Sequence, residues 1–174
     1  MSEKLFIYKM VLFGNEAVGK TSLVERFVNN RFEESYLSTL GYNVYEKRMA
    51  YLNFTISLMI YDVGGQEKFR ELRKKYAEGA NTAFIIYDVT DLNSFSNVMM
   101  WKTELNEIAG NIPFIIIGNK LDLEARRQVP TAEAMRVSSA LGALSFFETS
   151  AKTGTGVEDA FKLLVIKTHE YYVL

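Results

Sequence analysis

The residues that most clearly indicate chemistry lie near the amino end, where residues 14–21 read G-x-x-x-x-G-K-T directly after an apolar run at residues 7–13. Glycine tolerates positive φ and has no Cβ, so backbone N–H groups in such a loop can curl around phosphates. A helix that begins near Gly19 adds the positive end of its dipole. Lys20 can then reach the β- and γ-phosphates, and the Thr21 hydroxyl can coordinate Mg²⁺. The pattern predicts a nucleotide-phosphate site built from Gly14, Asn15, Glu16, Ala17, Val18, Gly19, Lys20, Thr21 and Ser22.

Two polar loops farther along the chain are candidates for the base site. Asn-Lys-Leu-Asp at residues 119–122 follows an apolar run at residues 114–118, and Thr-Ser-Ala-Lys at residues 149–152 follows a second short apolar segment. The Asp122 carboxylate can accept two hydrogen bonds from the ring N–H and the exocyclic amine of guanine, a donor pair that adenine does not offer on that edge. The loops therefore predict selection of GTP over ATP, with a base pocket formed by Asn119, Lys120, Asp122, Ser150, Ala151 and Lys152.

A third group of residues could sense the γ-phosphate and act on it. Asp62 follows an alternating segment and could hold Mg²⁺, while the Gly65 N–H and the polar loop around Thr39 could contact the γ-phosphate. The Gln66 amide can donate and accept at once, which suits orientation of an attacking water. We expect catalytic roles for Gln66, Lys20 and Thr39, and metal ligation by Thr21, Thr39 and Asp62.

The elements that must position these loops follow a strand-helix-strand order. Apolar runs at residues 5–13, 83–89 and 114–118 are typical of strands buried on both faces of a parallel sheet. The segments 42–51 and 54–62 alternate in polarity and predict an antiparallel pair with a turn near Asn53. Three further segments have apolar residues at helical spacing. A capping-box pattern at Thr155 and Glu158 predicts the start of the last helix. The apolar positions of these helices are Leu23, Val24, Phe27, Val28, Phe95, Val98, Met99, Leu105, Ile108, Val157, Ala160, Phe161 and Leu164.

Length and composition narrow the possible functions. The 174 residues suit a single domain, residues 1–174, and the formal net charge of -1 gives no basic footprint for nucleic acid. No apolar run approaches the ~20 residues that span a bilayer. The chain contains no cysteine, which excludes disulfides, thiolate metal sites and lipidation of cysteine within it. We expect a cytoplasmic monomer without its own membrane anchor, or a peripheral membrane protein where a lipid-bearing tail is added.

Taken together, these motifs resemble the Ras superfamily of small GTPases, and within it the Rab branch. All five nucleotide motifs are present in the family's order, and Rab-like stretches occur at residues 32–41, 87–91, 118–123 and 148–152. The resemblance implies an α/β P-loop NTPase fold with a six-stranded, mostly parallel sheet, one antiparallel edge pair and five helices on both faces. It also places Phe32 against the guanine, Tyr36 at the nucleotide, and Thr39 as a second hydroxyl ligand of Mg²⁺.

The implied function is a molecular switch that binds GTP or GDP with Mg²⁺, hydrolyses GTP slowly and recruits effectors in the GTP state, in Rab-like membrane trafficking. Effector, activator and exchange proteins would bind at two segments, called here the first switch segment (residues 32–41) and the second switch segment (residues 64–76). Two alternatives stay open on the residues alone. One is a GTP/GDP-binding module with little hydrolysis, and the other is a P-loop kinase or ATPase.

Four features depart from the family pattern. Glu16 and Ala17 fall where glycine or serine is more common, and we expect the acidic Glu16 to slow hydrolysis or block activators. The Asp-Val-Gly-Gly-Gln segment at residues 62–66 resembles the Arf and Gα branches. The positions of the Rab effector-facing aromatic cluster hold Val44, Tyr61 and Tyr76, so only part of that surface is kept. Finally, no cysteine tail follows the last helix, near whose end His169 is expected to be exposed.

Overall fold

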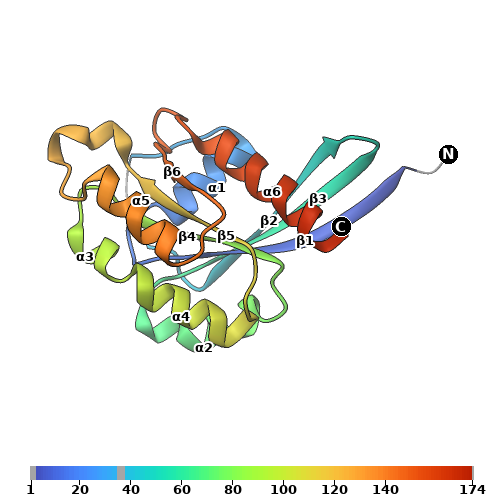
Figure 1. Ribbon diagram of the computed structural model, residues 1–174, viewed down its shortest axis with the longest axis horizontal. Helices are drawn as coiled ribbons and strands as arrows, with labels where there is room; N and C mark the ends of the chain where they lie inside the picture. Colours follow the sequence, from blue (N-terminus) through green and yellow to red (C-terminus); the bar gives the residue numbers. More distant parts are fainter. Residues whose placement is uncertain (1–2, 35–37, 174) are drawn as a thin grey trace.

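The computed structural model describes residues 3–34 and 38–173, which form a six-stranded sheet with helices on both faces (Figure 1). The spatial order of the strands is β2-β3-β1-β4-β5-β6. Only the β2–β3 pair is antiparallel, and the other four pairings are parallel. The strands are β1 (Lys4–Phe13), β2 (Tyr42–Tyr51), β3 (Phe54–Val63), β4 (Thr82–Asp88), β5 (Phe114–Asn119) and β6 (Phe146–Glu148).

The strand bounds follow the hydrophobic pattern closely. All side chains of β4 and β5 are buried, as expected for strands covered on both faces, whereas β2 alternates between exposed and half-buried positions. Tyr51 pairs with Phe54, so β2 and β3 are joined by a two-residue loop in which Leu52 has a φ of 53°. The predicted antiparallel edge pair and its turn near Asn53 are confirmed.

Helices connect these strands. They are α1 (Lys20–Asn29), α2 (Arg70–Ala77), α3 (Leu92–Ser96), α4 (Val98–Ala109), α5 (Thr131–Ala140) and α6 (Val157–Val173). Short 3₁₀ turns cover Glu67–Phe69 and Leu121–Arg126. The helical pattern expected over residues 95–108 is divided at Asn97, which explains why the described residues contain six α-helical segments where the resemblance implied five helices.

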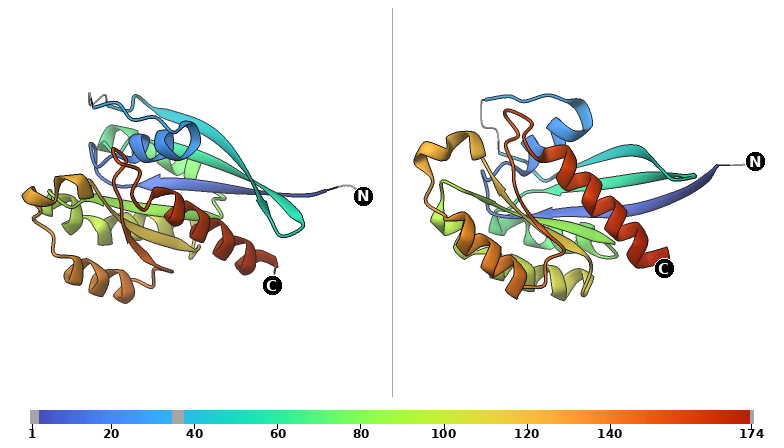
Figure 2. Two further views of the ribbon diagram at one scale, coloured as in Figure 1. Left: turned by 90° about the horizontal axis from the view of Figure 1, so that it is seen from above. Right: turned by 45° about the horizontal axis from the view of Figure 1, so that its top comes forward.

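The core consists of two apolar layers, one on each face of the sheet. Helices α1 and α6 contribute Leu23, Phe161 and Leu164 to one layer, and α2, α4 and α5 contribute Ala77, Leu105 and Ala134 to the other. In Figure 2, α1 and α6 lie on one face of the sheet, and α4 and α5 lie on the other. The layers hold the strands at fixed register, so the loops that leave the carboxyl ends of β1, β3, β4 and β5 meet at one end of the sheet (Figure 1).

His169 is buried, so the expectation that it would be exposed is wrong. Its side chain is 4% exposed and lies within an aromatic cluster of β1, β2 and β3, with the Phe6 ring centroid at 4.6 Å. The Tyr8 hydroxyl and His169 Nδ1 are 2.9 Å apart and share a hydrogen bond. Helical spacing alone could not show this, because the cluster is created by the long β1 and the β2–β3 hairpin passing beneath the end of α6.

We predict that removal of the hydroxyl group changes the free energy of unfolding by different amounts at two buried tyrosines. Tyr8→Phe takes away the partner of His169, so the free energy of unfolding should fall by about 1–2 kcal/mol. Tyr87→Phe should leave it unchanged or raise it slightly, because the Tyr87 hydroxyl is buried and has no hydrogen-bond partner in the described part of the chain. Urea unfolding of both variants under the same buffer measures the difference. Equal losses would contradict the assignment of these two hydroxyls.

Candidate functional site

The phosphate-loop residues 14–19 connect β1 to α1 and approach their neighbours closely. A Cβ on Gly14 would lie 2.4 Å from the Ile86 carbonyl oxygen, and one on Gly19 would lie 2.3 Å from Asn119 Nδ2. Gly19 also has a φ of 99°, which favours glycine. Ala17 has a φ of 68° without being glycine, a conformation that costs roughly 1–2 kcal/mol. The loop is therefore a tight backbone turn at the end of β1.

Lys20 points into this loop. Its Nζ donates hydrogen bonds to the backbone oxygens of Gly14 at 2.9 Å and Asn15 at 2.8 Å. Burial lowers the pKa of the Lys20 ammonium to about 8, although the nearby Asp62 carboxylate acts in the opposite direction. The side chain is thus a buried cation held by neutral carbonyls, a setting in which an anionic ligand would be a stronger partner.

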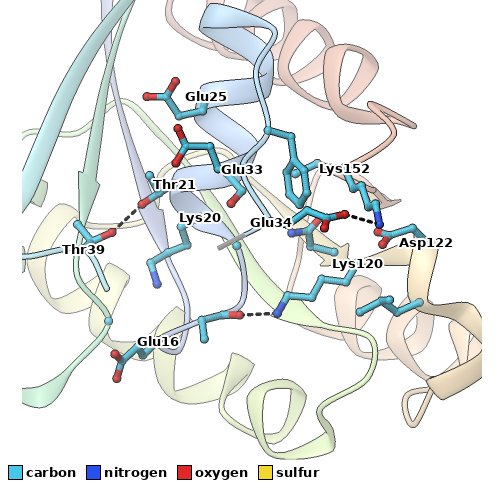
Figure 3. Close-up of a pocket in the computed structure, with 18 of the residues that line it drawn as sticks. Glu16, Lys20, Thr21, Glu25, Glu33, Glu34, Thr39, Lys120, Asp122 and Lys152 are labelled. Carbon is cyan, nitrogen blue, oxygen red and sulfur yellow. Dashed lines mark hydrogen bonds and ion pairs between the residues drawn. The ribbon is translucent and has the colours of Figure 1, made fainter. Parts of the chain in front are cut away.

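Three oxygen-bearing side chains meet beside Lys20. The Thr21 and Thr39 hydroxyls are 2.6 Å apart (Figure 3). Thr21 also donates a short hydrogen bond to Asp62 Oδ2. Asp62 Oδ1 is buried and has no hydrogen-bond partner among the described residues, and burial raises the pKa of this carboxyl. Hydroxyl and carboxylate oxygens are donors that Mg²⁺ prefers. An orphaned carboxylate oxygen next to two hydroxyls therefore fits a divalent cation.

The base-side loops are tied to the phosphate loop by Asn119, whose side chain is buried. Its Nδ2 donates to the Val18 carbonyl at 3.0 Å, and its Oδ1 accepts from the Thr149 hydroxyl at 3.0 Å. Lys120 has a φ of 70°, and its Nζ donates to the Ala17 carbonyl at 2.7 Å. Asn119 and Lys120 thus position the two loops relative to each other. Thr149, which sequence analysis placed in a candidate base loop without giving it a role, belongs to the same unit.

Asp122 lies on the far side of the pocket from the Thr21 and Thr39 pair (Figure 3). The Ser150 hydroxyl donates to Asp122 Oδ1 at 2.7 Å, which fixes the carboxylate. Lys152 makes an ion pair of 2.8 Å with Glu34 across the pocket, and Phe32 lines the same space. Tyr36, the remaining expected contact of the first switch segment, falls outside the described residues. The site has a base-side end with an oriented carboxylate and a phosphate-side end with Lys20.

One cavity of about 640 Å³ joins both ends. Its lining includes most of the residues that the sequence predicts, and it has room for a ligand of nucleotide size. Five described residues of the predicted site are not part of this lining, namely Gly14, Asn15, Val18, Asp62 and Ser150. The Asn15 amide oxygen accepts from Trp101 Nε1 at 2.8 Å, and the Val18 side chain is in the core. The predicted residues in the lining are Glu16, Ala17, Gly19, Lys20, Thr21, Ser22, Phe32, Thr39, Gly65, Gln66, Asn119, Lys120, Asp122, Ala151 and Lys152.

The second switch segment lies directly against the phosphate loop. A Cβ on Gly65 would be 2.2 Å from the Gly14 carbonyl oxygen, so only glycine fits. Arg73, which sequence analysis did not identify as functional, is 2% exposed and donates to the Gly64 and Gln66 carbonyls at 3.0 and 2.7 Å. Its other guanidinium nitrogens bind both carboxylate oxygens of Glu104 at 3.0 and 3.1 Å.

Glu16 contacts both switch segments. Its carboxylate accepts a hydrogen bond from Gln66 Nε2 at 2.8 Å, and Oε1 also accepts a short hydrogen bond from the Ser38 hydroxyl. Figure 3 places Glu16 on the same side of the pocket as Thr39 and away from Asp122. Glu16, the residue that departs from the family pattern, therefore connects the phosphate loop to both switch segments through hydrogen bonds.

Comparisons with known proteins assign the chain to a family. The sequence pattern of the Ras family matches residues 9–170. Ras-related protein RABD2c of Arabidopsis thaliana is 39% identical over 166 residues, which cover 94% of this chain and 82% of that protein. Ras-related protein Rab-11C of Dictyostelium discoideum is 40% identical over 164 residues, which cover 94% of this chain and 73% of that protein. This chain therefore belongs to the Ras family of GTP-hydrolysing switch proteins and is similar to its Rab members.

Proposed function

We propose that residues 1–174 form one domain that binds GTP or GDP with Mg²⁺ in the cavity between the phosphate loop and the base-side loops. The observation that carries this proposal is the arrangement of Asp122 and Lys20 at opposite ends of one cavity. A carboxylate held by Ser150 suits a pair of N–H donors on a base, and the buried Lys20 ammonium suits the phosphates. The cavity of about 640 Å³ between these ends leaves room for the sugar.

We assign the metal-binding role to the side-chain oxygens that meet beside Lys20. Thr21, Thr39 and Asp62 would hold Mg²⁺, which supplies charge neutralisation at the β- and γ-phosphates when bound. The orphaned Asp62 Oδ1 supports this role, because a buried carboxylate oxygen without a partner is costly unless a ligand satisfies it. Thr39 belongs to the first switch segment, so its position would depend on the ligand it contacts.

In hydrolysis, the chain supplies positioning and electrostatic stabilisation. Lys20 would neutralise charge that develops on the phosphates, and Gln66 would orient the attacking water through its amide. The Gly65 N–H would donate to the terminal phosphate, and the close packing of Gly65 against the phosphate loop supports this role. Loss of the terminal phosphate would release both switch segments, which is the basis of a switch.

We further propose that effector, activator and exchange proteins bind the two switch segments and the adjoining strands. Tyr42, Tyr61 and Tyr76 form an aromatic group between β2, β3 and α2. Tyr61 stacks on Tyr76, and the Tyr42 ring is tilted against Tyr76 with a centroid distance of 4.0 Å. Val44 beside them is exposed. Such an aromatic surface suits protein recognition. The Rab relatives support a role in membrane trafficking, with the chain acting as a monomer in the cytoplasm or at a membrane surface.

The comparisons do not favour a kinase or ATPase, nor a module without hydrolysis, because the matched family consists of GTP hydrolases. Among the described residues, no helix has both the length and the apolar character needed to cross a bilayer.

The first test concerns the base. Asp122→Asn replaces one acceptor oxygen by an NH₂ group that would face the donors of guanine, so GDP affinity should fall by about 2–4 kcal/mol, or ~30- to ~900-fold. Competition titration with GDP, XDP and ADP measures the change. Glu124→Gln, an exposed carboxylate two residues away, should bind GDP like the wild type. Equal affinity of the wild type for GDP and ADP would overturn the guanine assignment.

The second test concerns the attacking water. Gln66→Leu removes the amide, so single-turnover GTP hydrolysis should slow at least about tenfold, which corresponds to 1.4 kcal/mol in the barrier. GTP affinity should change little, since the amide is assigned to the transition state rather than to ground-state binding. Gln128→Leu is the matched control, because its side chain contacts the Leu92 N–H outside the cavity. An unchanged rate in Gln66→Leu would remove Gln66 from the mechanism.

A further inference from the structure

The side chain of Arg127 joins the two base-side loops at a point away from the cavity. Arg127 directly follows the 3₁₀ turn Leu121–Arg126, which contains Asp122. Its Nη2 donates a short hydrogen bond to Glu148 Oε2. Glu148 is the last residue of β6 and directly precedes the loop at residues 149–152. The guanidinium therefore connects the turn that contains Asp122 to the start of the other base-side loop.

The guanidinium of Arg127 is held on several sides, so its orientation is fixed. Its Nε donates to both carboxylate oxygens of Glu124 at 2.9 Å, and its Nη1 donates to the Val129 carbonyl at 3.0 Å. The second oxygen of Glu148, Oε1, accepts a short hydrogen bond from the Thr131 hydroxyl. The Arg127 and Glu148 side chains are 16% and 13% exposed, whereas that of Glu124 is 60% exposed. Solvent therefore screens the ion pair with Glu148 less than the ion pair with Glu124.

The position of Asp122 depends on how these two loops lie relative to each other. Asp122 Oδ1 accepts from the Ser150 hydroxyl at 2.7 Å, which is a contact between the two loops on the base side of the cavity. Arg127 and Glu148 flank this contact in the sequence, since Arg127 comes after Asp122 and Glu148 comes before Ser150. Neither Arg127 nor Glu148 belongs to the lining of the cavity. Their ion pair therefore acts on a bound base through the position of Asp122 rather than by direct contact.

We propose that Arg127 is a positioning residue for the selection of guanine, because its ion pair with Glu148 holds the Asp122 carboxylate in place. The inference rests on the proposed function, which assigns Asp122 to the base. Guanine offers this carboxylate a ring N–H and an exocyclic amine, and both hydrogen bonds need good geometry at the same time. Hydrogen bonds weaken steeply when their angle falls. Loss of the ion pair would thus weaken the double contact and reduce the discrimination of guanine from bases that lack the amine.

A comparison of GDP with IDP tests this role. Hypoxanthine, the base of IDP, keeps the ring N–H of guanine but lacks the exocyclic amine. The ratio of the Kd for IDP to the Kd for GDP therefore reports the second hydrogen bond of Asp122. In Arg127→Met this ratio should fall at least about threefold relative to the wild type, because a hydrogen bond to a charged group is weakened. Arg127→Lys should give an intermediate ratio, because lysine keeps the charge but lacks the planar fork. Nucleotide competition titration measures these constants.

Glu148→Gln and a control variant complete the experiment. Glu148→Gln removes the charge of the other partner with little change of shape, so it should lower the ratio in the same way, and the double variant with Arg127→Met should lower it no further. Arg136→Met is the control, because the ion pair of Arg136 with Glu133 is exposed, and the ratio should keep its wild-type value.

An unchanged ratio in Glu148→Gln, together with an unchanged ratio in Arg127→Met or, should that variant not fold, in Arg127→Lys, would overturn the inference. A loss of affinity for GDP and IDP by the same factor would also overturn it, because such a loss indicates a general effect on the fold rather than an effect on the second hydrogen bond of Asp122.

Failure of the proposed function gives a different result. If the wild type binds GDP and ADP equally, the guanine assignment is wrong, and the role of Arg127 is rejected with it. If the wild type prefers GDP to both ADP and IDP while the variants keep its ratio, only the role of Arg127 is rejected. A wild type that excludes ADP but binds GDP and IDP equally would likewise reject the role of Arg127 and leave the site itself in place.

Discussion

The buried amide of Asn119 is the contact on which the geometry of the site most depends. It donates to the Val18 carbonyl in the phosphate loop and accepts from Thr149 in the last base-side loop, so one side chain joins three loops that lie at the ends of different strands. Buried hydrogen bonds of this kind are costly to leave unmade, and they reinforce one another in low dielectric. The close approach of Gly19 to Asn119 Nδ2 shows that the loop is shaped around this amide. The distance between the phosphate-side and base-side ends of the cavity is thereby set.

Much of this arrangement could be predicted from the sequence, because the determining forces are local. The buried runs of β4 and β5, the alternation of β2 and β3, and the glycines of the phosphate loop each reflect the environment of a few neighbouring residues. Strands end where polar loops begin, and parallel strands present those loops at one end of the sheet. The fold and the convergence of the predicted loops follow from these rules.

Other features depended on partners that are distant in sequence. Arg73 reads as one of several charges on an exposed helix, and only the packing of α2 against α4 makes it a buried cation paired with Glu104. Thr149 acquires its role from Asn119, 30 residues away. His169 becomes buried because β1 extends beneath α6. A weak signal for Arg73 was available, since an arginine on the apolar side of an amphipathic helix needs an acidic partner.

Gln66 makes hydrogen bonds through both its backbone and its side chain, and the two sets of contacts differ in how far they are buried. Its backbone carbonyl accepts from Arg73, which is braced by Glu104 and by the Trp101 ring, 4.9 Å from the guanidinium carbon. Trp101 in turn donates a part-buried hydrogen bond to Asn15, so the contacts of the Gln66 backbone lead back to the phosphate loop. The amide end instead contacts Glu16, in a bond that lies at the solvent-exposed surface. Buried, braced contacts persist, whereas exposed ones exchange readily with water or a ligand. The backbone of the second switch segment is thus fixed near the phosphate loop, and the Gln66 side chain, which we propose orients the attacking water, is the part free to change partners.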